Sequence, residues 1–120
     1  NNLRQRFNQG EPAVVAAMQR LAELTVEARA AILARDAEGL GRAIDRNFAL
    51  RQSICKLAPA HVEMVERARD AGATASFTGS GGAIVGTCPD DASLERLQAA
   101  LEPLGCRVIR PRILPEDSAG

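Results

Sequence analysis

Apolar residues recur at helical spacing through the first 72 residues of the chain. From residue 12 to residue 35 they return at three-, four- and seven-residue steps, and Pro12 suits a first helical turn, so we expect one long amphipathic helix. Asp36 suits the N-terminal cap of a second helix. Pro59 opens a third, which Gly72 should close. The expected inward positions of the first two helices are Val14, Met18, Leu21, Ala28 and Ile32, then Leu40, Ile44, Asn47/Phe48 and Ile54.

The spacing of the apolar residues changes after residue 73. Residues 74–78 and 83–88 are typical of β-strands, and they flank a glycine-rich loop. A fourth helix should follow Pro89-Asp90-Asp91, end at Gly105, and be followed by a short strand at residues 106–110. Its inner face is formed by Leu94, Leu97, Leu101 and Leu104. The predicted order of elements is therefore ααα-ββαβ.

This order indicates an α+β fold, a ferredoxin-like antiparallel sheet with a helical layer on one face. At 120 residues the chain suits a single domain, with helices over about 12–72 and the sheet and fourth helix over about 73–113. Three strands leave such a sheet one short. We expect the missing strand to lie before Asn1, in a polypeptide of which this chain is a part.

Charge and cysteine usage exclude several classes of function. Lys+Arg and Asp+Glu both number 15, and the only aromatic residues are three phenylalanines, so we expect no nucleic-acid partner. No apolar run approaches the ~20 residues that cross a bilayer, so we expect no membrane partner. Cys55, Cys88 and Cys106 lack C-x-x-C spacing, and the single histidine, His61, has no second ligand at metal spacing. The sequence therefore predicts a cytoplasmic protein without a metal site of its own.

The loop Gly79-Ser80-Gly81-Gly82 is the strongest candidate for chemistry, because three glycines in four residues let a phosphate approach the backbone. It does not fit the common nucleotide templates. The phosphate loop G-x-x-x-x-G-K-[ST] needs a lysine after the glycines, whereas Ala83 follows here. A dinucleotide fingerprint starting at Gly79 needs Gly or Ala where Ile84 stands.

Phe77-Thr78-Gly79-Ser80-Gly81-Gly82 resembles the third signature of the GHMP kinases, roughly K-x-[ST]-G-[AS]-G-G between two strands. The resemblance extends through residues 45–51 and 61–73, and it is strongest to the C-terminal half of glucuronokinase-like sugar kinases. One position departs from the signature, because Ser76 stands where relatives carry a basic residue. The resemblance implies the C-terminal domain of an ATP-dependent sugar kinase, with a glucuronate-like acceptor.

The resemblance also implies roles for particular residues and partners. Thr78, Gly79, Ser80, Gly81 and Gly82 would form a loop near the γ-phosphate and the acceptor hydroxyl. ATP and Mg²⁺ would be cofactors of the whole enzyme. The motif P-x-x-x-G-L-x-[SG]-S and the acidic catalytic residue would belong to an N-terminal kinase domain of the same polypeptide. We therefore expect no catalytic residue in this chain and no activity from it alone.

Two further side chains are candidates on the second helix. Asn47 places an amide at the edge of an apolar stripe, where it either bonds a neighbouring backbone group or reaches a sugar hydroxyl. Arg51 follows one turn later and is either an ordinary solvated arginine of the helix surface or a bidentate partner for a sugar carboxylate.

A rival interpretation treats the chain as a stand-alone ferredoxin-like module that binds a small metabolite or forms a homodimer through its sheet edge. In that case the glycine loop is an anion-binding or plain hairpin turn.

Overall fold

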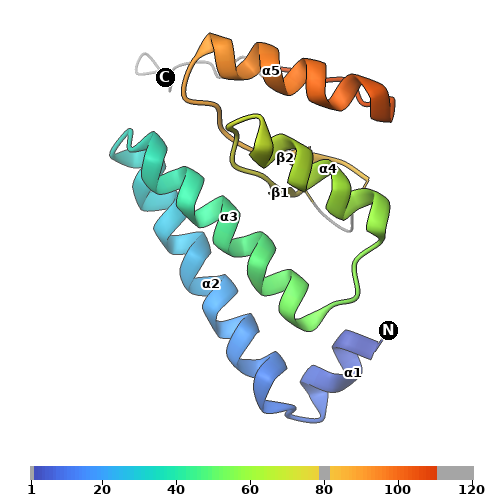
Figure 1. Ribbon diagram of the computed structural model, residues 1–120. Coiled ribbons are helices and arrows are strands. Elements are labelled where there is room, and N and C mark those ends of the chain that lie inside the picture. Colours follow the sequence, from blue (N-terminus) through green and yellow to red (C-terminus); the bar gives the residue numbers. More distant parts are fainter. Residues whose placement is uncertain (1, 79–81, 111–120) are drawn as a thin grey trace, which may run out of the picture.

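The computed structural model describes residues 2–78 and 82–110, which form five α-helices, one 3-10 helix and a two-stranded sheet (Figure 1). A short helix that the sequence pattern did not predict, α1 (Asn2–Asn8), precedes the others. The side chain of Arg6 fixes α1 in place: Nε and Nη2 each donate to the Glu11 carboxylate at 2.9 Å, and Nη1 donates to the carbonyl of Ile54 at 2.8 Å. The hydrogen bond from Arg6 lowers the pKa of Glu11. The side chain of Arg6 therefore connects α1 both to Glu11 and to Ile54, which lies 48 residues further along the chain.

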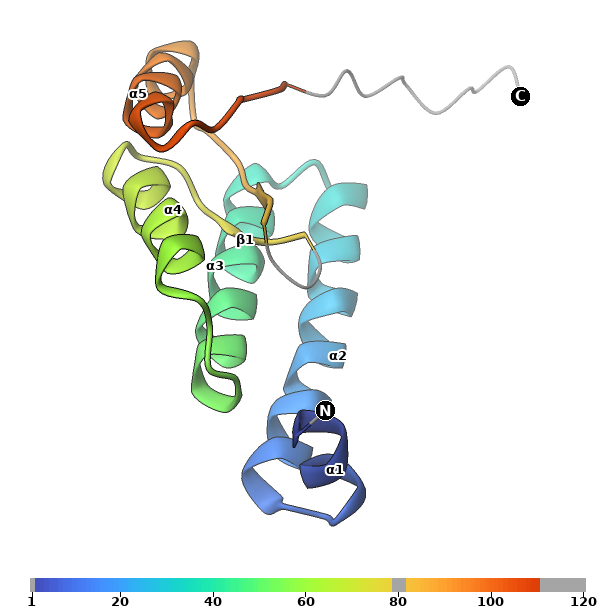
Figure 2. The same ribbon diagram turned by 90° about the vertical axis from the view of Figure 1, so that its right-hand side faces the viewer.

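Helices α2 (Pro12–Leu33) and α3 (Ala37–Ile54) form an antiparallel hairpin that runs the length of the molecule (Figures 1 and 2). The predicted cap is confirmed, because Asp36 Oδ1 accepts a hydrogen bond from the amide of Gly39 at 2.9 Å. The expected inward position of Ile32 is wrong: its side chain is 60% exposed. The buried face of α2 instead follows the seven-residue spacing of Ala17, Leu24 and Ala31.

The third predicted helix is α4 (Pro59–Asp70), and Gly72 closes it as expected. Gly72 has φ +100°, and the next amide, that of Ala73, bonds back to the carbonyl of Ala68 at 3.0 Å. This is the left-handed helix ending that glycine favours. The chain then turns into the sheet.

The predicted hairpin is confirmed as β1 (Ser76–Phe77) paired antiparallel with β2 (Ile84–Val85), with Ser76 opposite Val85 and Phe77 opposite Ile84. Backbone bonds Thr74 N to Thr87 O (3.0 Å) and Thr78 N to Ala83 O (3.2 Å) continue the same register on both sides. β1 packs on α3, and the rings of Phe48 and Phe77 meet edge-to-face at 5.4 Å. The buried residues of this core are Phe48, Val65, Ala68, Ala73, Ala75 and Phe77.

The fourth predicted helix is α5 (Asp91–Leu101), continued by the 3-10 helix η1 (Glu102–Leu104) and ended by Gly105 at φ +76°. The prediction of a strand at residues 106–110 is wrong, because these residues are not in a strand. A strand needs a hydrogen-bonded neighbour, and the described sheet contains only β1 and β2. The described residues therefore form an α+β unit with a two-stranded rather than a three-stranded sheet. No helix in this part of the chain combines the length and apolarity needed to cross a membrane.

Candidate functional site

The turn end of the β1–β2 hairpin carries the predicted phosphate loop, of which Thr78 and Gly82 are described. Thr78 is exposed, and its backbone amide donates to the carbonyl of Ala83. Gly82 has φ +86°, and a Cβ placed there would have no neighbour within 4 Å. Gly79, Ser80 and Gly81 lie outside the described residues. The two described ends of the loop are thus solvent-accessible and uncrowded.

Asn47 lies under the hairpin, where α3 meets β1. Its Oδ1 accepts a hydrogen bond from Ser76 Oγ at 2.7 Å, and Ser76 is only 3% exposed. The partner is therefore a side chain of the sheet, which neither of the two sequence-based interpretations of Asn47 included. Because Ser76 bonds into the α3–β1 junction, the side chain at the position of the signature's basic residue points away from solvent.

Arg51 is half-buried, one turn beyond Asn47 on α3. Both residues lie on the helix that supports β1, and the loop extends from the other end of that strand. The structure therefore places the two predicted sugar-side residues and the loop on adjoining elements.

A second polar contact between α3 and β1 was not predicted. Asp45 Oδ1 accepts a hydrogen bond from the backbone amide of Ala75 at 2.9 Å, and Ala75 is buried. Arg69 of α4 lies beside the same carboxylate, with Nε 3.2 Å from Oδ1 and Nη2 donating to the Asp45 carbonyl at 3.1 Å. The Arg69 guanidinium also covers the ring of Phe48, 5.0 Å from its centroid. These contacts join α3, α4 and β1 into one support below the loop.

A third contact fixes the base of the hairpin. The hydroxyls of Thr74 and Thr87 are 2.7 Å apart and face Gly41 of α3. A Cβ at Gly41 would lie 2.8 Å from Thr74 Cγ2 and 3.0 Å from Thr87 Oγ1, so only glycine allows this approach. The hairpin is therefore fixed against α3 at positions 74, 75 and 76.

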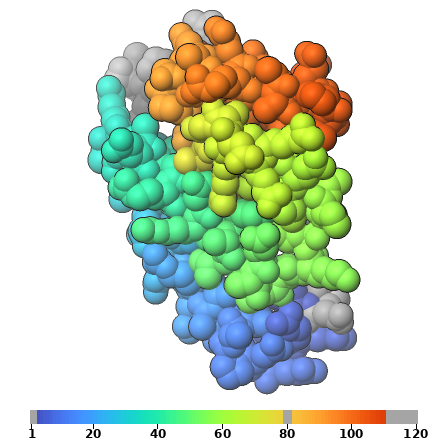
Figure 3. All heavy atoms as spheres, viewed as in Figure 1, coloured from blue at the N-terminus to red at the C-terminus, as the bar shows by residue number. Residues whose placement is uncertain are grey.

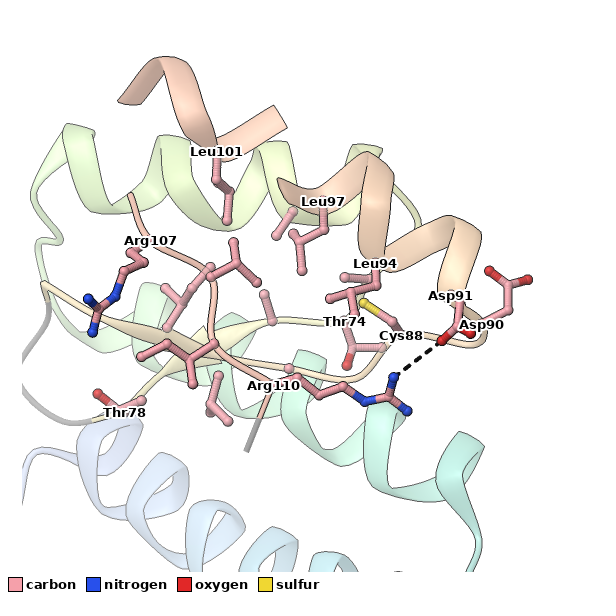
Figure 4. A pocket seen from close by; sticks show the side chains of 18 residues that line it. Thr74, Thr78, Cys88, Asp90, Asp91, Leu94, Leu97, Leu101, Arg107 and Arg110 are labelled. Atoms are coloured by element: carbon pink, nitrogen blue, oxygen red, sulfur yellow. Dashed lines mark hydrogen bonds and ion pairs between the residues drawn. The ribbon is translucent and has the colours of Figure 1, made fainter. Parts of the chain in front are cut away.

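A cavity of about 440 Å³ opens on the other side of the hairpin, between the sheet, α5 and residues 106–110 (Figure 4). Its walls are mainly apolar, and it includes Cys88, whose pKa is raised chiefly by burial. Asp90 at its margin caps α5: Oδ1 accepts from the amide of Ser93 at 2.8 Å, and this bond lowers the pKa of Asp90.

His61 has a structural neighbour. Its ring meets that of Phe77 edge-to-face at 5.8 Å, beside the aromatic core. Within the described ranges, no three His, Cys, Asp or Glu side chains gather closely enough to hold a metal ion.

A family model described as "GHMP kinases C terminal" matches residues 28–105. The chain belongs to this family of GHMP kinase C-terminal domains. The matched range contains the candidate residues from Gly41 to the leucines of α5, whereas α1, most of α2 and residues 106–110 lie outside it. The candidate loop and its support thus belong to the shared part of this GHMP kinase domain.

Two curated relatives are glucuronokinases of Arabidopsis thaliana. "Probable glucuronokinase 2" is 41% identical over 101 residues, covering 81% of this chain and 27% of the relative. "Glucuronokinase 1" is 37% identical over 99 residues, covering 79% of this chain and 27% of the relative. Hence this GHMP kinase domain is glucuronokinase-like and spans about a quarter of the length of these relatives. None of the solved structures matches it.

Sequence reasoning missed the Asp45–Arg69 pair and the Thr74–Thr87 pair. One signal was present, because Asp45 stands between apolar Ile44 and buried Phe48, much as Asn47 does. The partner of such a residue is not visible in the sequence, since Asp45 and Arg69 are separated by 24 positions.

Proposed function

We propose that this chain is the C-terminal domain of an ATP-dependent sugar kinase that phosphorylates a hydroxyl of a uronic acid, with glucuronate as the acceptor. The match of residues 28–105 to the GHMP kinase family, together with two glucuronokinase relatives, carries this proposal. Each relative is nearly four times longer than the matched segment, which leaves length for a nucleotide-binding domain. Catalysis then needs that domain, and this chain alone is inactive.

In this proposal the hairpin loop, from Thr78 to Gly82, helps to shape the space where the γ-phosphate meets the acceptor hydroxyl. Phosphoryl transfer depends on positioning and on charge stabilisation, which backbone N–H groups and hydroxyls supply. The uncrowded Gly82 and the exposed Thr78 support this role. The rigid contacts of Asp45, Asn47 and Gly41 with the hairpin would keep the loop in register.

The described residues do not offer a site for Mg²⁺, because no acidic cluster is found among them. In this proposal ATP and Mg²⁺ bind the nucleotide-binding domain. The sugar would approach from the α3 side, where Asn47 and Arg51 are its proposed hydrogen-bonding residues. A uronic acid suits Arg51, since a guanidinium can bind a carboxylate with two parallel hydrogen bonds.

The domain would reach the ferredoxin-like architecture by adding strands to the β1–β2 hairpin. Support for this comes from the element order, in which α2, α3 and α4 precede the hairpin and α5 follows it, as the sequence pattern predicts.

A pair of matched glycine variants tests the role of the loop. Gly82 and Gly10 both have positive φ, +86° and +74°, and a Cβ at either has no neighbour within 4 Å. Alanine should therefore cost each site a similar backbone strain, about 1–2 kcal/mol. In the full-length kinase that carries this chain, Gly82→Ala should lower kcat/KM for glucuronate at least tenfold, and Gly10→Ala less than twofold. Equal effects of the two variants would contradict a phosphate-side loop.

A further inference from the structure

The amide of Ala75, directly before β1, is bound by a side chain of α3 and not by the neighbouring strand. Residues 74 and 78 donate across the hairpin to 87 and 83, and 76 pairs with 85, so the amide at position 75 points away from β2. Its acceptor is Asp45 Oδ1, at 2.9 Å. Because a buried amide without a partner is costly, the position of this one carboxylate oxygen fixes where the strand lies on α3.

Arg69 of α4 contacts Asp45 at two places. Its Nη2 donates to the Asp45 carbonyl at 3.1 Å, and its Nε lies 3.2 Å from Asp45 Oδ1. Nε is buried and has no hydrogen-bond partner among the described residues, so its contact with Oδ1 is an ion pair. A guanidinium carries its donors in a rigid fork, and one such group can therefore engage the backbone and the side chain of one residue together. This double contact selects one orientation of the Asp45 carboxylate.

The same guanidinium also contacts Phe48, the second residue of α3 that packs on the strand. The Phe48 ring lies 5.0 Å from the guanidinium carbon of Arg69 and meets the ring of Phe77 edge-to-face. Phe77 directly precedes Thr78, where the loop begins. Figure 3 shows the face of the molecule on which α4, the helix that carries Arg69, lies between α3 and α5. Arg69 thus contacts both residues of α3, Asp45 and Phe48, that fix the strand leading into the loop.

We propose that Arg69 is a positioning residue for phosphoryl transfer, which acts through Asp45 and Phe48 to set the place of the loop that begins at Thr78. This inference rests on the proposed function, in which that loop shapes the space between the γ-phosphate and the acceptor hydroxyl. Ala75 and Thr78 are only three residues apart, about 10 Å along a strand, so a shift at Ala75 moves the start of the loop. A displacement of about 1 Å of a positioned group can cost about 100-fold in rate.

Two substitutions of Arg69 in the full-length kinase test the proposal. Arg69→Met keeps an unbranched stem beside Phe48 and removes every donor, so kcat with glucuronate should fall about tenfold or more. The KM values for sugar and ATP should stay within about twofold, because the loss concerns the transition state and not substrate binding. Arg69→Lys keeps the charge but lacks the fork, and its kcat should lie between those of the wild type and Arg69→Met.

Arg67→Met is the matched control. Arg67 lies on the same helix, and its ion pair, at 3.0 Å, is with Glu63 of that helix. It therefore removes the same charge without touching α3, and kcat should stay within about twofold of the wild type. Equal kcat values for Arg69→Met and Arg67→Met would overturn the proposal.

Amide hydrogen exchange of the same full-length proteins separates positioning from a general loss of stability. The amides of Thr74 and Thr78 donate across the hairpin and report whether it is folded. In Arg69→Met we expect the Ala75 amide to exchange about tenfold faster or more, and those of Thr74 and Thr78 to stay within about twofold of the wild type. An equal loss of protection at all three amides would mean that Arg69 only stabilises the fold, which would also overturn the proposal.

The exchange measurement also distinguishes a failure of this inference from a failure of the proposed function. If the full-length protein does not phosphorylate glucuronate, the kinase assignment is wrong, and a selective loss of protection at Ala75 still supports the action of Arg69 on the strand. If the full-length protein is a glucuronate kinase and Arg69→Met keeps the wild-type kcat, the proposed function stands and this inference is wrong.

Discussion

The hydrogen bond between Asn47 and Ser76 makes a quantitative prediction about how the loop is supported. Replacing Asn47 by alanine removes the acceptor of a hydroxyl that is 3% exposed and that solvent cannot reach. An unsatisfied buried hydroxyl costs about 1–3 kcal/mol, so Asn47→Ala should lower the free energy of unfolding by that amount. Ser76→Ala leaves the half-buried Asn47 carbonyl within reach of water and should cost about 1 kcal/mol or less.

The double variant distinguishes a direct bond from two independent effects. With both groups removed no polar atom is left unpaired, so the loss should be smaller than the sum of the single losses by about 1 kcal/mol. The assay is urea denaturation of the 120-residue chain, followed by circular dichroism, for all four members of the cycle. Ser53→Ala is the matched control, since Ser53 is exposed and bonds only to the carbonyl of Leu50 on its own helix. Additive losses would refute the reasoning.

The same variant also tests the proposed sugar contact. In the full-length kinase, Asn47→Ala should raise the KM for the sugar and leave the KM for ATP unchanged. Equal changes in both KM values would mean that Asn47 acts only by holding Ser76 and the hairpin in place.

Three further predictions follow from the packing and the caps. Gly41→Ala should lower the free energy of unfolding by about 1–3 kcal/mol, because its Cβ would crowd Thr74 and Thr87; urea denaturation measures this, and an unchanged midpoint would contradict the close approach. Arg35→Gly should raise the melting temperature, since Arg35 holds φ +56° at the end of α2; a lower melting temperature would contradict this. The lowered pKa of Asp90 means that its cap stabilises the fold above about pH 4 and is lost as the pH falls through the folded-state pKa. Asp90→Asn should make stability less dependent on pH in that range, and an unchanged acid titration would count against the cap.

Local signals predicted most of the helical part of the fold. The apolar spacing can be read directly from the sequence. The residues that mark helix ends also act within a few positions of those ends, and they are Pro12, Asp36, Pro59 and Gly72. The exposed position of Ile32 shows the limit of this method. Near the end of a long helix, the neighbouring element decides whether a given residue is buried. Here that neighbour is α3.

The sheet was harder to predict because a strand depends on its partner. The hairpin could be predicted, since its two strands are joined by a glycine-rich turn of four residues. Residues 106–110 have the composition of a strand, but no described strand pairs with them. The glycine loop was recognisable from its motif, whereas the contacts that support it, Asp45 with Ala75 and Asn47 with Ser76, join positions about 30 residues apart.

The most direct test of the proposed function is ATP-dependent phosphorylation of glucuronate by the full-length protein that carries this chain, with glucose as the matched acceptor lacking the carboxylate. The account predicts ADP release with glucuronate at a kcat/KM at least 100-fold above that with glucose, and no ADP release from the 120-residue chain alone. A full-length protein that phosphorylates neither sugar, or a 120-residue chain that is active by itself, would contradict it.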